Sequence, residues 1–186
     1  TGTMFAYEQG KITPDIICLS KGITGGYMTL STILTTDELY NAFYDEYTKL
    51  NAFLHSHSYT ANPIACAAAN ASLDLFEKNN VIEKNKMLST YIKKSLEELS
   101  NHLHVSDVRQ HGMITAIEIV KNKATKKPYD WKERRGIRAY QYGLEHNVLI
   151  RPLGNVIYFM PPYIIKKKEI DKVIDVIKGA IDVATK

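Results

Sequence analysis

The sequence predicts an α/β protein in two parts: a portion of an α/β sheet domain over residues 1–78 and a compact α+β domain over residues 79–186. Three observations predict this class. The 186 residues are 45% hydrophobic and 24% charged, which is typical of a folded globular protein. The short apolar run IICL at 16–19 is typical of a strand buried on both faces of a parallel sheet. In the second part, amphipathic stretches alternate with pairs of short apolar runs, which favours a separate α+β layer.

The first part is expected to hold two strands and two helices, at 16–19, 30–35, 39–47 and 63–76. Thr36 is a suitable N-cap for the first helix, because acidic residues follow it in the first turn. Asn62 and Pro63 predict the start of the second helix, since proline suits the first helical position. The second helix is rich in alanine, so we expect it to pack closely against another element or another subunit.

The second part is expected to hold three helices and two pairs of strands. The stretch 81–99 carries its large aliphatic residues on one stripe with charges opposite, which predicts an amphipathic helix. The other two helices are expected at 131–146 and 167–184, and the strands at 103–109, 113–120, 148–151 and 156–159. A polar loop at 121–130 separates the second strand from the next helix.

Charge and composition exclude several classes of function. No run approaches the roughly 18 apolar residues of a membrane helix. The net charge is +4, but acids and bases are interleaved, so we do not expect a nucleic-acid partner. Cys18 and Cys66 lie outside any C-x-x-C pattern among apolar or small residues, which predicts reduced, buried thiols and a cytoplasmic location. The histidine pairs lack companions at ligand spacing, so no metal site is expected.

Lys21 is the first candidate for chemistry. It follows the apolar strand, at the end where open α/β sheets place ligands, and Gly22, Gly25 and Gly26 come directly after it. A partly desolvated lysine there has a lowered pKa and can attack a carbonyl to form a Schiff base. The alternative is a solvated lysine at a strand end, and by spacing alone that alternative stays open. The order of lysine and glycines does not match a phosphate-binding P-loop.

Two further segments could bind anionic groups. The stretch from His55 to Asn62 places hydroxyls, including Ser58, just before a helix N-terminus, where unpaired N–H groups and the helix dipole favour an anion. A merely capped helix with a polar approach loop is the alternative there. Arg151 ends an apolar strand, and Tyr158 lies on the facing strand. Arg151 is either a member of a structural ion pair or a clamp for a carboxylate.

Together, the stretches CLSKGITGG, HSHSYTANPIACAAANASL and IRPLGNVIYFMPPYI resemble the class III, fold-type I aminotransferases that use pyridoxal 5'-phosphate. The resemblance covers nearly the whole chain, and its last two stretches are most similar to the branch of the family that acts in biotin biosynthesis. It implies that residues 1–78 are the C-terminal portion of the cofactor-binding large domain. It implies that residues 79–186 are the small C-terminal α+β domain.

The resemblance also implies roles for single residues. Lys21 would carry pyridoxal phosphate as a Schiff base and shuttle a proton, and Ser58 would hold the cofactor phosphate, assisted by the Tyr59 backbone. In the family this serine reaches across from the neighbouring subunit, so a homodimer with a shared active site is expected. Arg151 would bind the carboxylate of the amino acceptor, and Tyr158 and the segment 22–28 would line the substrate pocket.

The sequence departs from the family pattern at a few positions. Ser58 stands where relatives often have threonine, and Ser56 and Ala61 stand where glycine is common. The family's pyridine-binding aspartate, stacking aromatic and Gly-Ser phosphate loop all precede the lysine, and this sequence contains none of them. The chain is therefore expected to be the C-terminal half of a longer enzyme and inactive alone.

The expected activity is amino transfer, in which small molecules are the partners and neither nucleic acid nor membrane takes part. The branch implies transfer to 7-keto-8-aminopelargonate, giving 7,8-diaminopelargonate. The donor is S-adenosylmethionine in most relatives and lysine in some, and the sequence leaves this choice open. The competing hypothesis is a non-catalytic interaction or dimerisation module that retains the C-terminal half of the fold.

Overall fold

A computed structural model describes all 186 residues, and its contacts divide the chain into two compact units. One unit comprises Phe5–Val81, and the other comprises Thr1–Met4 together with Ile82–Lys186. The division predicted at residue 78 concerns the domains of a longer protein and stays a prediction.

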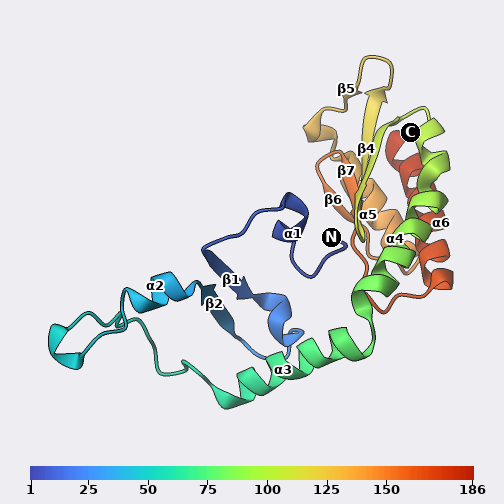
Figure 1. Cartoon of the computed structure of the whole chain (residues 1–186). Coiled ribbons are helices and arrows are strands. Elements are labelled where there is room, and N and C mark those ends of the chain that lie inside the picture. The colour runs from blue at the N-terminus through green and yellow to red at the C-terminus, as the bar shows by residue number, and fades with distance from the viewer. The chain divides into compact units, whose positions relative to one another are not determined.

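The unit Phe5–Val81 is built on a two-stranded antiparallel ribbon (Figure 1). Strand β1 (Ile16–Ser20) pairs with β2 (Ser31–Thr35) in a register that runs from Ile16 opposite Thr35 to Ser20 opposite Ser31. The helices of this unit are α1 (Tyr7–Gly10), α2 (Asp37–Asn41) and α3 (Pro63–Lys78), with 3₁₀ helices at Lys21–Thr24 and Tyr47–Lys49.

The N-terminal caps of the two helices predicted in this unit, Thr36 and Asn62, are confirmed. The Thr36 hydroxyl accepts a hydrogen bond from the Leu39 N–H, and the Asn62 side chain accepts from Ile64 and Ala65. The predicted end of the first helix is wrong, because α2 stops at Asn41 instead of residue 47. An aromatic, acidic stretch with low helix propensity follows Asn41.

Two expectations about burial in this unit are also wrong. Strand β1 alternates exposed and half-buried residues, and its neighbour β2 is antiparallel, so β1 is not covered on both faces in this chain. Cys66 is half-buried, but Cys18 is an exposed free thiol. The physical reason is the same in both cases: a two-stranded ribbon within this unit has one face covered and one face open to solvent.

The other unit contains a five-stranded antiparallel sheet in the order β3–β4–β7–β6, with β5 paired to β4. The strands are β3 (Val105–His111), β4 (Ile114–Asn122), β5 (Lys127–Pro128), β6 (Arg151–Leu153) and β7 (Val156–Phe159). The helices are α4 (Val81–Leu96), α5 (Arg135–Glu145) and α6 (Lys167–Thr185), with 3₁₀ helices at Glu97–Asn101 and Trp131–Glu133.

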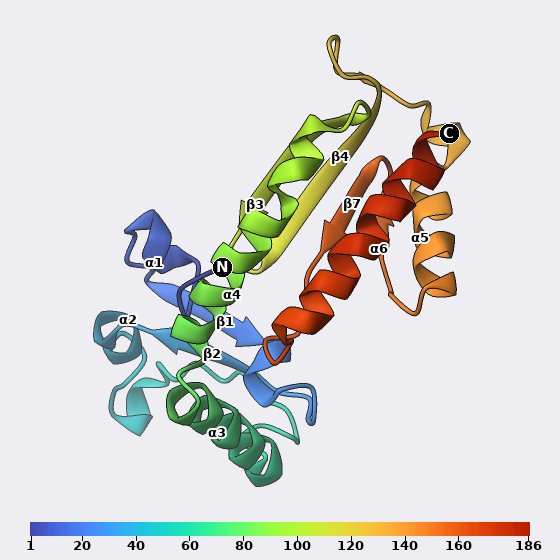
Figure 2. The same ribbon diagram turned by 90° about the vertical axis from the view of Figure 1, so that its right-hand side faces the viewer.

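The core of this unit lies between the sheet and its helices, and Figure 2 shows α4 and α6 running along the sheet. The stripe predicted on the first helix is confirmed at Ile92, Leu96 and Leu99, which are all buried. The largest fully buried aliphatic side chains of the sheet and α6 are Ile117, Ile119, Ile157, Ile170, Ile177 and Ile181. Across the rim of this core, the Tyr91 hydroxyl on α4 donates to Asp171 Oδ1 on α6 at 2.6 Å.

Glycine allows α5 to approach the β6–β7 hairpin closely. A Cβ atom on Gly136 would lie 2.5 Å from the carbonyl oxygen of Gly154 and 2.5 Å from Cβ of Pro152. No side chain larger than hydrogen fits this gap, so the helix lies directly against the hairpin that carries Arg151.

No helix of the structure combines the length and the apolar character needed to cross a membrane.

Candidate active site

Lys21 begins a turn that leaves β1 at its carboxyl end. It is the first residue of the 3₁₀ helix Lys21–Thr24, and its backbone has a φ of 54°, in the left-handed region. Non-glycine residues occupy this region at a cost and often at functional sites. The side chain of Lys21 is exposed. The predicted partial desolvation is therefore wrong within this chain, because the unit Phe5–Val81 buries Thr24 in this turn but not Lys21.

The turn is closed by hydrogen bonds around Thr24. The Thr24 hydroxyl donates to the carbonyl oxygen of Met28 at 2.5 Å, and the Thr24 carbonyl accepts from the N–H of Tyr27 at 3.1 Å. Gly25, at a φ of 59°, donates its N–H to the carbonyl of Gly22 at 3.0 Å. These bonds hold the chain between β1 and β2 in one compact turn.

Helix α3 supports this turn. The 3₁₀ helix Lys21–Thr24 packs against α3, whose buried residues are Ala65 and Ala69. Small side chains let two backbones approach closely, so the alanine-rich sequence finds another element as its neighbour at these two positions. Ala67 and Ala71, on the same helix, are exposed.

The Ser58 segment forms a turn immediately before α3. The Thr60 N–H donates to the carbonyl of His57 at 2.9 Å, and Ala61 adopts a left-handed φ of 57°. Asn62 Oδ1 accepts from the N–H groups of Ile64 and Ala65 at 3.0 and 3.2 Å.

The predicted unpaired donors of the helix N-terminus are therefore already bonded to the Asn62 cap, and the alternative of a capped helix is correct for that part. The Tyr59 N–H is also engaged, by the His57 ring nitrogen Nδ1 at 3.1 Å. Ser58 itself is exposed and precedes the first residue of α3, the positive end of the helix dipole, by five residues. Because these N–H groups already have acceptors, an anion bound here would be attracted by the Ser58 hydroxyl and by the helix dipole.

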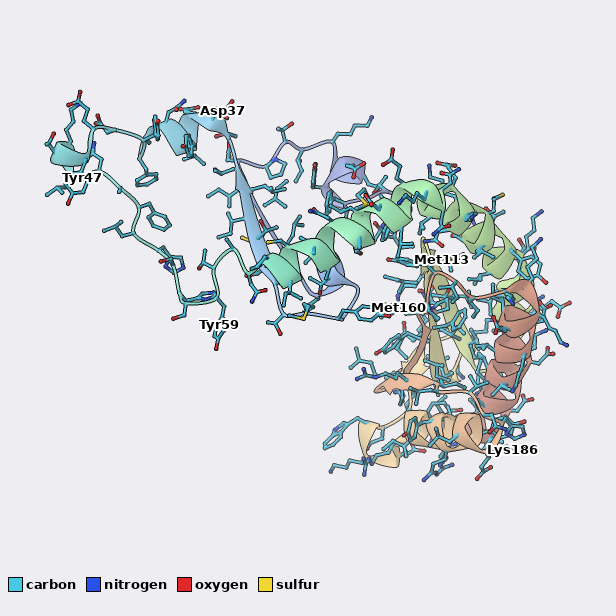
Figure 3. The ribbon with its side chains drawn as sticks, turned by 90° about the horizontal axis from the view of Figure 1, so that it is seen from below. Asp37, Tyr47, Tyr59, Met113, Met160 and Lys186 are labelled. Atoms are coloured by element: carbon cyan, nitrogen blue, oxygen red, sulfur yellow. The ribbon has the colours of Figure 1, made fainter.

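A long exposed apolar segment precedes Ser58. Figure 3 labels Tyr47 and Tyr59 on the stretch that links α2 to α3. The large apolar side chains exposed along it are Phe43, Tyr44, Tyr47, Leu50, Phe53 and Leu54, with Tyr40 in α2 before it and Tyr59 directly after Ser58. Exposed apolar residues in such number are typical of a segment that packs against other protein.

Arg151 begins β6, so the strand predicted at 148–151 with Arg151 at its end is wrong, and Arg151 faces Tyr158 across the β6–β7 pair. They are direct partners in the antiparallel register, which puts their side chains on the same face of the sheet. Arg151 is exposed and forms none of the ion pairs of this chain, whereas Arg109 and Arg135 both pair with acidic residues. Of the two predicted roles, the structural ion pair is therefore not realised within these residues.

The structure thus brings some of the predicted site residues together and not others. Arg151 and Tyr158 are neighbours in one unit, while Lys21, Ser58 and Tyr59 belong to the other unit, with no hydrogen bond between Lys21 and the Ser58 turn. Sequence reasoning missed Thr24. A hydroxyl residue inside a glycine-rich turn, able to bond to the backbone a few residues away, was the signal that could have indicated it.

The unit Phe5–Val81 offers one side chain that can react with a carbonyl group and a separate one that can bind a phosphate. Lys21 offers an exposed primary amine that can react with an aldehyde. Ser58 offers a hydroxyl near a helix N-terminus, a favourable place for a phosphate. No group of three or more His, Cys, Asp and Glu side chains is placed to hold a metal ion.

Comparison with known proteins gives one consistent family. The family model described as "Aminotransferase class-III" matches residues 1–181. A protein of Helicobacter pylori named adenosylmethionine-8-amino-7-oxononanoate aminotransferase is 51% identical over 178 residues, covering 94% of this chain and 39% of that protein. A protein of the same name from Geobacter sulfurreducens is 46% identical over 185 residues, covering 100% of this chain and 41% of that protein.

Solved structures agree with the sequence comparison. The crystal structure of the protein of that name from Methanocaldococcus jannaschii superposes with a TM-score of 0.88 at 44% identity, covering 98% of this chain and 42% of that one. An omega-transaminase from Thermomicrobium roseum superposes with a TM-score of 0.89 at 28% identity, covering 100% of this chain and 41% of that one. The chain spans about two fifths of the length of the relatives that it matches.

Proposed function

Because the chain belongs to the class III aminotransferase family, we propose that it is the part of a longer enzyme that binds pyridoxal 5'-phosphate through Lys21 and transfers amino groups. Its fold is that of the corresponding part of the class III, fold-type I structures, as the sequence predicted. The omega-transaminase from Pseudomonas jessenii, which is 27% identical and superposes with a TM-score of 0.90, was solved in complex with PMP. The match to curated relatives over at least 94% of the chain is the observation that carries this proposal.

The proposed reaction belongs to biotin biosynthesis. The relatives that match at 40–51% identity bear the name adenosylmethionine-8-amino-7-oxononanoate aminotransferase. We therefore assign 8-amino-7-oxononanoate, also called 7-keto-8-aminopelargonate, as the amino acceptor and 7,8-diaminopelargonate as the product. S-adenosylmethionine is the donor that the name indicates. Lysine is the donor to test against it.

Each site residue has a proposed task. The cofactor, when bound, supplies an aldehyde and an electron-withdrawing ring that stabilises negative charge at the substrate carbon. Lys21 Nζ forms the covalent attachment and holds or delivers the proton next to that carbon. Ser58 donates its hydroxyl to the cofactor phosphate, near the positive end of α3 and beside the Tyr59 backbone. Arg151 binds the acceptor's carboxylate, and Tyr158 lines the same pocket from the facing strand.

A homodimer with a shared active site is part of the proposal. The exposed apolar stretch between α2 and α3 supports it, because this stretch ends in the Ser58 turn and presents aromatic side chains to another protein surface. In the dimer, Ser58 and Tyr59 serve the active site of the neighbouring subunit. A cytoplasmic location is proposed for the enzyme.

The decisive experiment uses the full-length protein. It is incubated with pyridoxal phosphate, reduced with borohydride and digested, and the labelled peptide is sequenced by mass spectrometry. The expected adduct lies on Lys21 and disappears in Lys21→Ala. Lys11→Ala is a matched control, because Lys11 is also exposed and also has a left-handed φ, of 52°. Labelling on a residue other than Lys21 refutes the assignment.

The same preparation separates the enzyme from the alternative, a non-catalytic dimerisation module. An enzyme produces 7,8-diaminopelargonate from the keto substrate and one of the two donors. A module forms a stable dimer but acquires no label on Lys21 and forms no product.

A further inference from the structure

Thr24 has an unusual environment for a polar residue in a loop. Within residues 21–28 it is the buried residue, with 2% of its surface exposed, while the larger and more apolar Tyr27 and Met28 are exposed. Hydrophobicity alone would order these residues the other way. The burial of Thr24 therefore reflects a geometric role in the turn.

That role is visible in its two hydrogen bonds. The Thr24 carbonyl accepts from the Tyr27 N–H, and its side-chain hydroxyl donates to the Met28 carbonyl at 2.5 Å. One residue thus ties the 3₁₀ helix that begins at Lys21 to the chain that enters β2. A buried hydroxyl that loses its acceptor, or a carbonyl that loses its donor, carries a desolvation penalty, so this arrangement resists opening.

Lys21 needs such a restraint. Its left-handed φ of 54° is disfavoured for a side chain with a Cβ, and such a conformation persists where the surrounding structure enforces it. Lys21 and Thr24 are the two ends of one 3₁₀ turn, and this turn packs against α3. If the Thr24 end loosens, the enforced conformation at Lys21 relaxes as well.

We propose that Thr24 is a positioning residue for Lys21: its buried hydroxyl, bonded to the Met28 carbonyl, holds the turn that sets the place of the Lys21 amine. This inference rests on the proposed function, since it assigns Thr24 a part in presenting the amine to the cofactor aldehyde. Thr24 is buried in the turn, so its proposed action on Lys21 passes through the backbone of the turn.

The test compares Thr24→Val with Thr24→Ser in the full-length protein. Valine keeps the shape and removes the hydroxyl, whereas serine keeps the hydroxyl. The readouts are the rate of borohydride-trapped labelling of Lys21 by pyridoxal phosphate, the pH midpoint of the visible cofactor band, and the thermal unfolding midpoint. A small displacement of a reacting group costs up to about 100-fold in rate. We expect Thr24→Val to slow labelling about tenfold and to shift the pH midpoint, with Thr24→Ser within about twofold of wild type.

The outcomes separate the inference from the proposed function. If wild type labels at Lys21 and Thr24→Val matches it in rate and pH midpoint, even with a lower unfolding midpoint, Thr24 is merely structural and the inference is wrong. If wild type itself acquires no label at Lys21, both the proposed function and the inference fall. If Thr24→Val does not fold, Thr24→Cys replaces it. The cysteine S–H is a weak donor, so Thr24→Cys should label Lys21 more slowly than Thr24→Ser does. A labelling rate equal to that of wild type overturns the inference.

Discussion

A single added methyl group at Gly136 should destabilise the protein measurably. On α5, a Cβ at this position would lie 2.5 Å from the Gly154 carbonyl oxygen and 2.5 Å from Cβ of Pro152. Real Cβ atoms do not approach other heavy atoms this closely. Both neighbours belong to rigid parts of the chain, a backbone carbonyl and a proline ring, so helix and hairpin must separate in Gly136→Ala.

Two opposing effects set the size of the change. Overpacking a tight contact costs about 1–3 kcal/mol, and rigid neighbours place this case at the upper end. Gly136 is the second residue of α5, so the gain in helix propensity from alanine is at most the roughly 1 kcal/mol found in a helix interior. The expected net loss in the free energy of unfolding is therefore about 1–2 kcal/mol.

Urea unfolding of the full-length protein, followed by circular dichroism, measures this loss. Gly179→Ala on α6 is the matched control, because the nearest atoms to its added Cβ belong to one side chain, the ring of Tyr142, and not to a backbone carbonyl or a proline ring. We expect Gly179→Ala to remain within about 1 kcal/mol of wild type. If Gly136→Ala unfolds at the same urea concentration as wild type, the close approach of α5 to the hairpin is not the constraint inferred here.

Three further predictions concern the site and the stability of both units. Arg151→Ala should raise the KM for the keto substrate about 10- to 100-fold, as for loss of a charge-assisted hydrogen bond, and an unchanged KM in steady-state assays would contradict the clamp. Ala61→Gly should stabilise the protein by about 0.5–1 kcal/mol because Ala61 has a φ of 57°, whereas Ala67→Gly within α3 should destabilise it by about 1 kcal/mol; calorimetry distinguishes the two signs. The hydrogen bond to Asp171 raises the pKa of Tyr91 above its ordinary value of 10.0, so the unfolded chain ionises first. The stabilisation from the Tyr91 hydrogen bond is complete below pH 10 and is lost as the pH rises towards the pKa of Tyr91 in the folded protein. The difference in unfolding free energy between wild type and Tyr91→Phe should therefore shrink between about pH 9 and 11, as measured by urea titrations.

Local signals predicted the parts of the fold that depend on a few neighbouring residues. The pair Asn62-Pro63 marked the start of α3, and the apolar run VIYF after Gly154-Asn155 gave β7 its observed bounds. Both rest on short-range physics: a side-chain cap, a restricted φ, and a β-branched and aromatic run that follows a turn.

Expectations that depended on distant neighbours were less accurate. The run IICL was interpreted as a strand covered on both faces, yet β1 alternates exposed and half-buried residues beside an antiparallel partner. The exposure of Lys21 has the same origin. Composition indicates that a segment is apolar, but the number of layers that cover it is set by other parts of the fold.

The candidate site was predictable in its parts and not in its geometry. The sequence placed Arg151 and Tyr158 on facing strands, and the register makes them direct partners. It left open whether the first N–H groups of α3 bond to a cap or to an anion, because both compete for the same donors, and the structure shows them bonded to Asn62. Thr24 was overlooked, since its importance appears only once its burial is known.

Helix α3 sets a fixed spacing along the chain between the Ser58 turn and the contact with the lysine turn. Its first residues follow the Ser58 turn directly, while the helix, with Ala65 and Ala69 buried, packs against the 3₁₀ helix that begins at Lys21. Adding or deleting one residue between Ser58 and this contact would rotate the packed face by about 100° about the helix axis. The interval from Ser58 to Ala69 should therefore tolerate changes of residue type far better than changes of length, in contrast to the solvent-facing connection between β4 and β5.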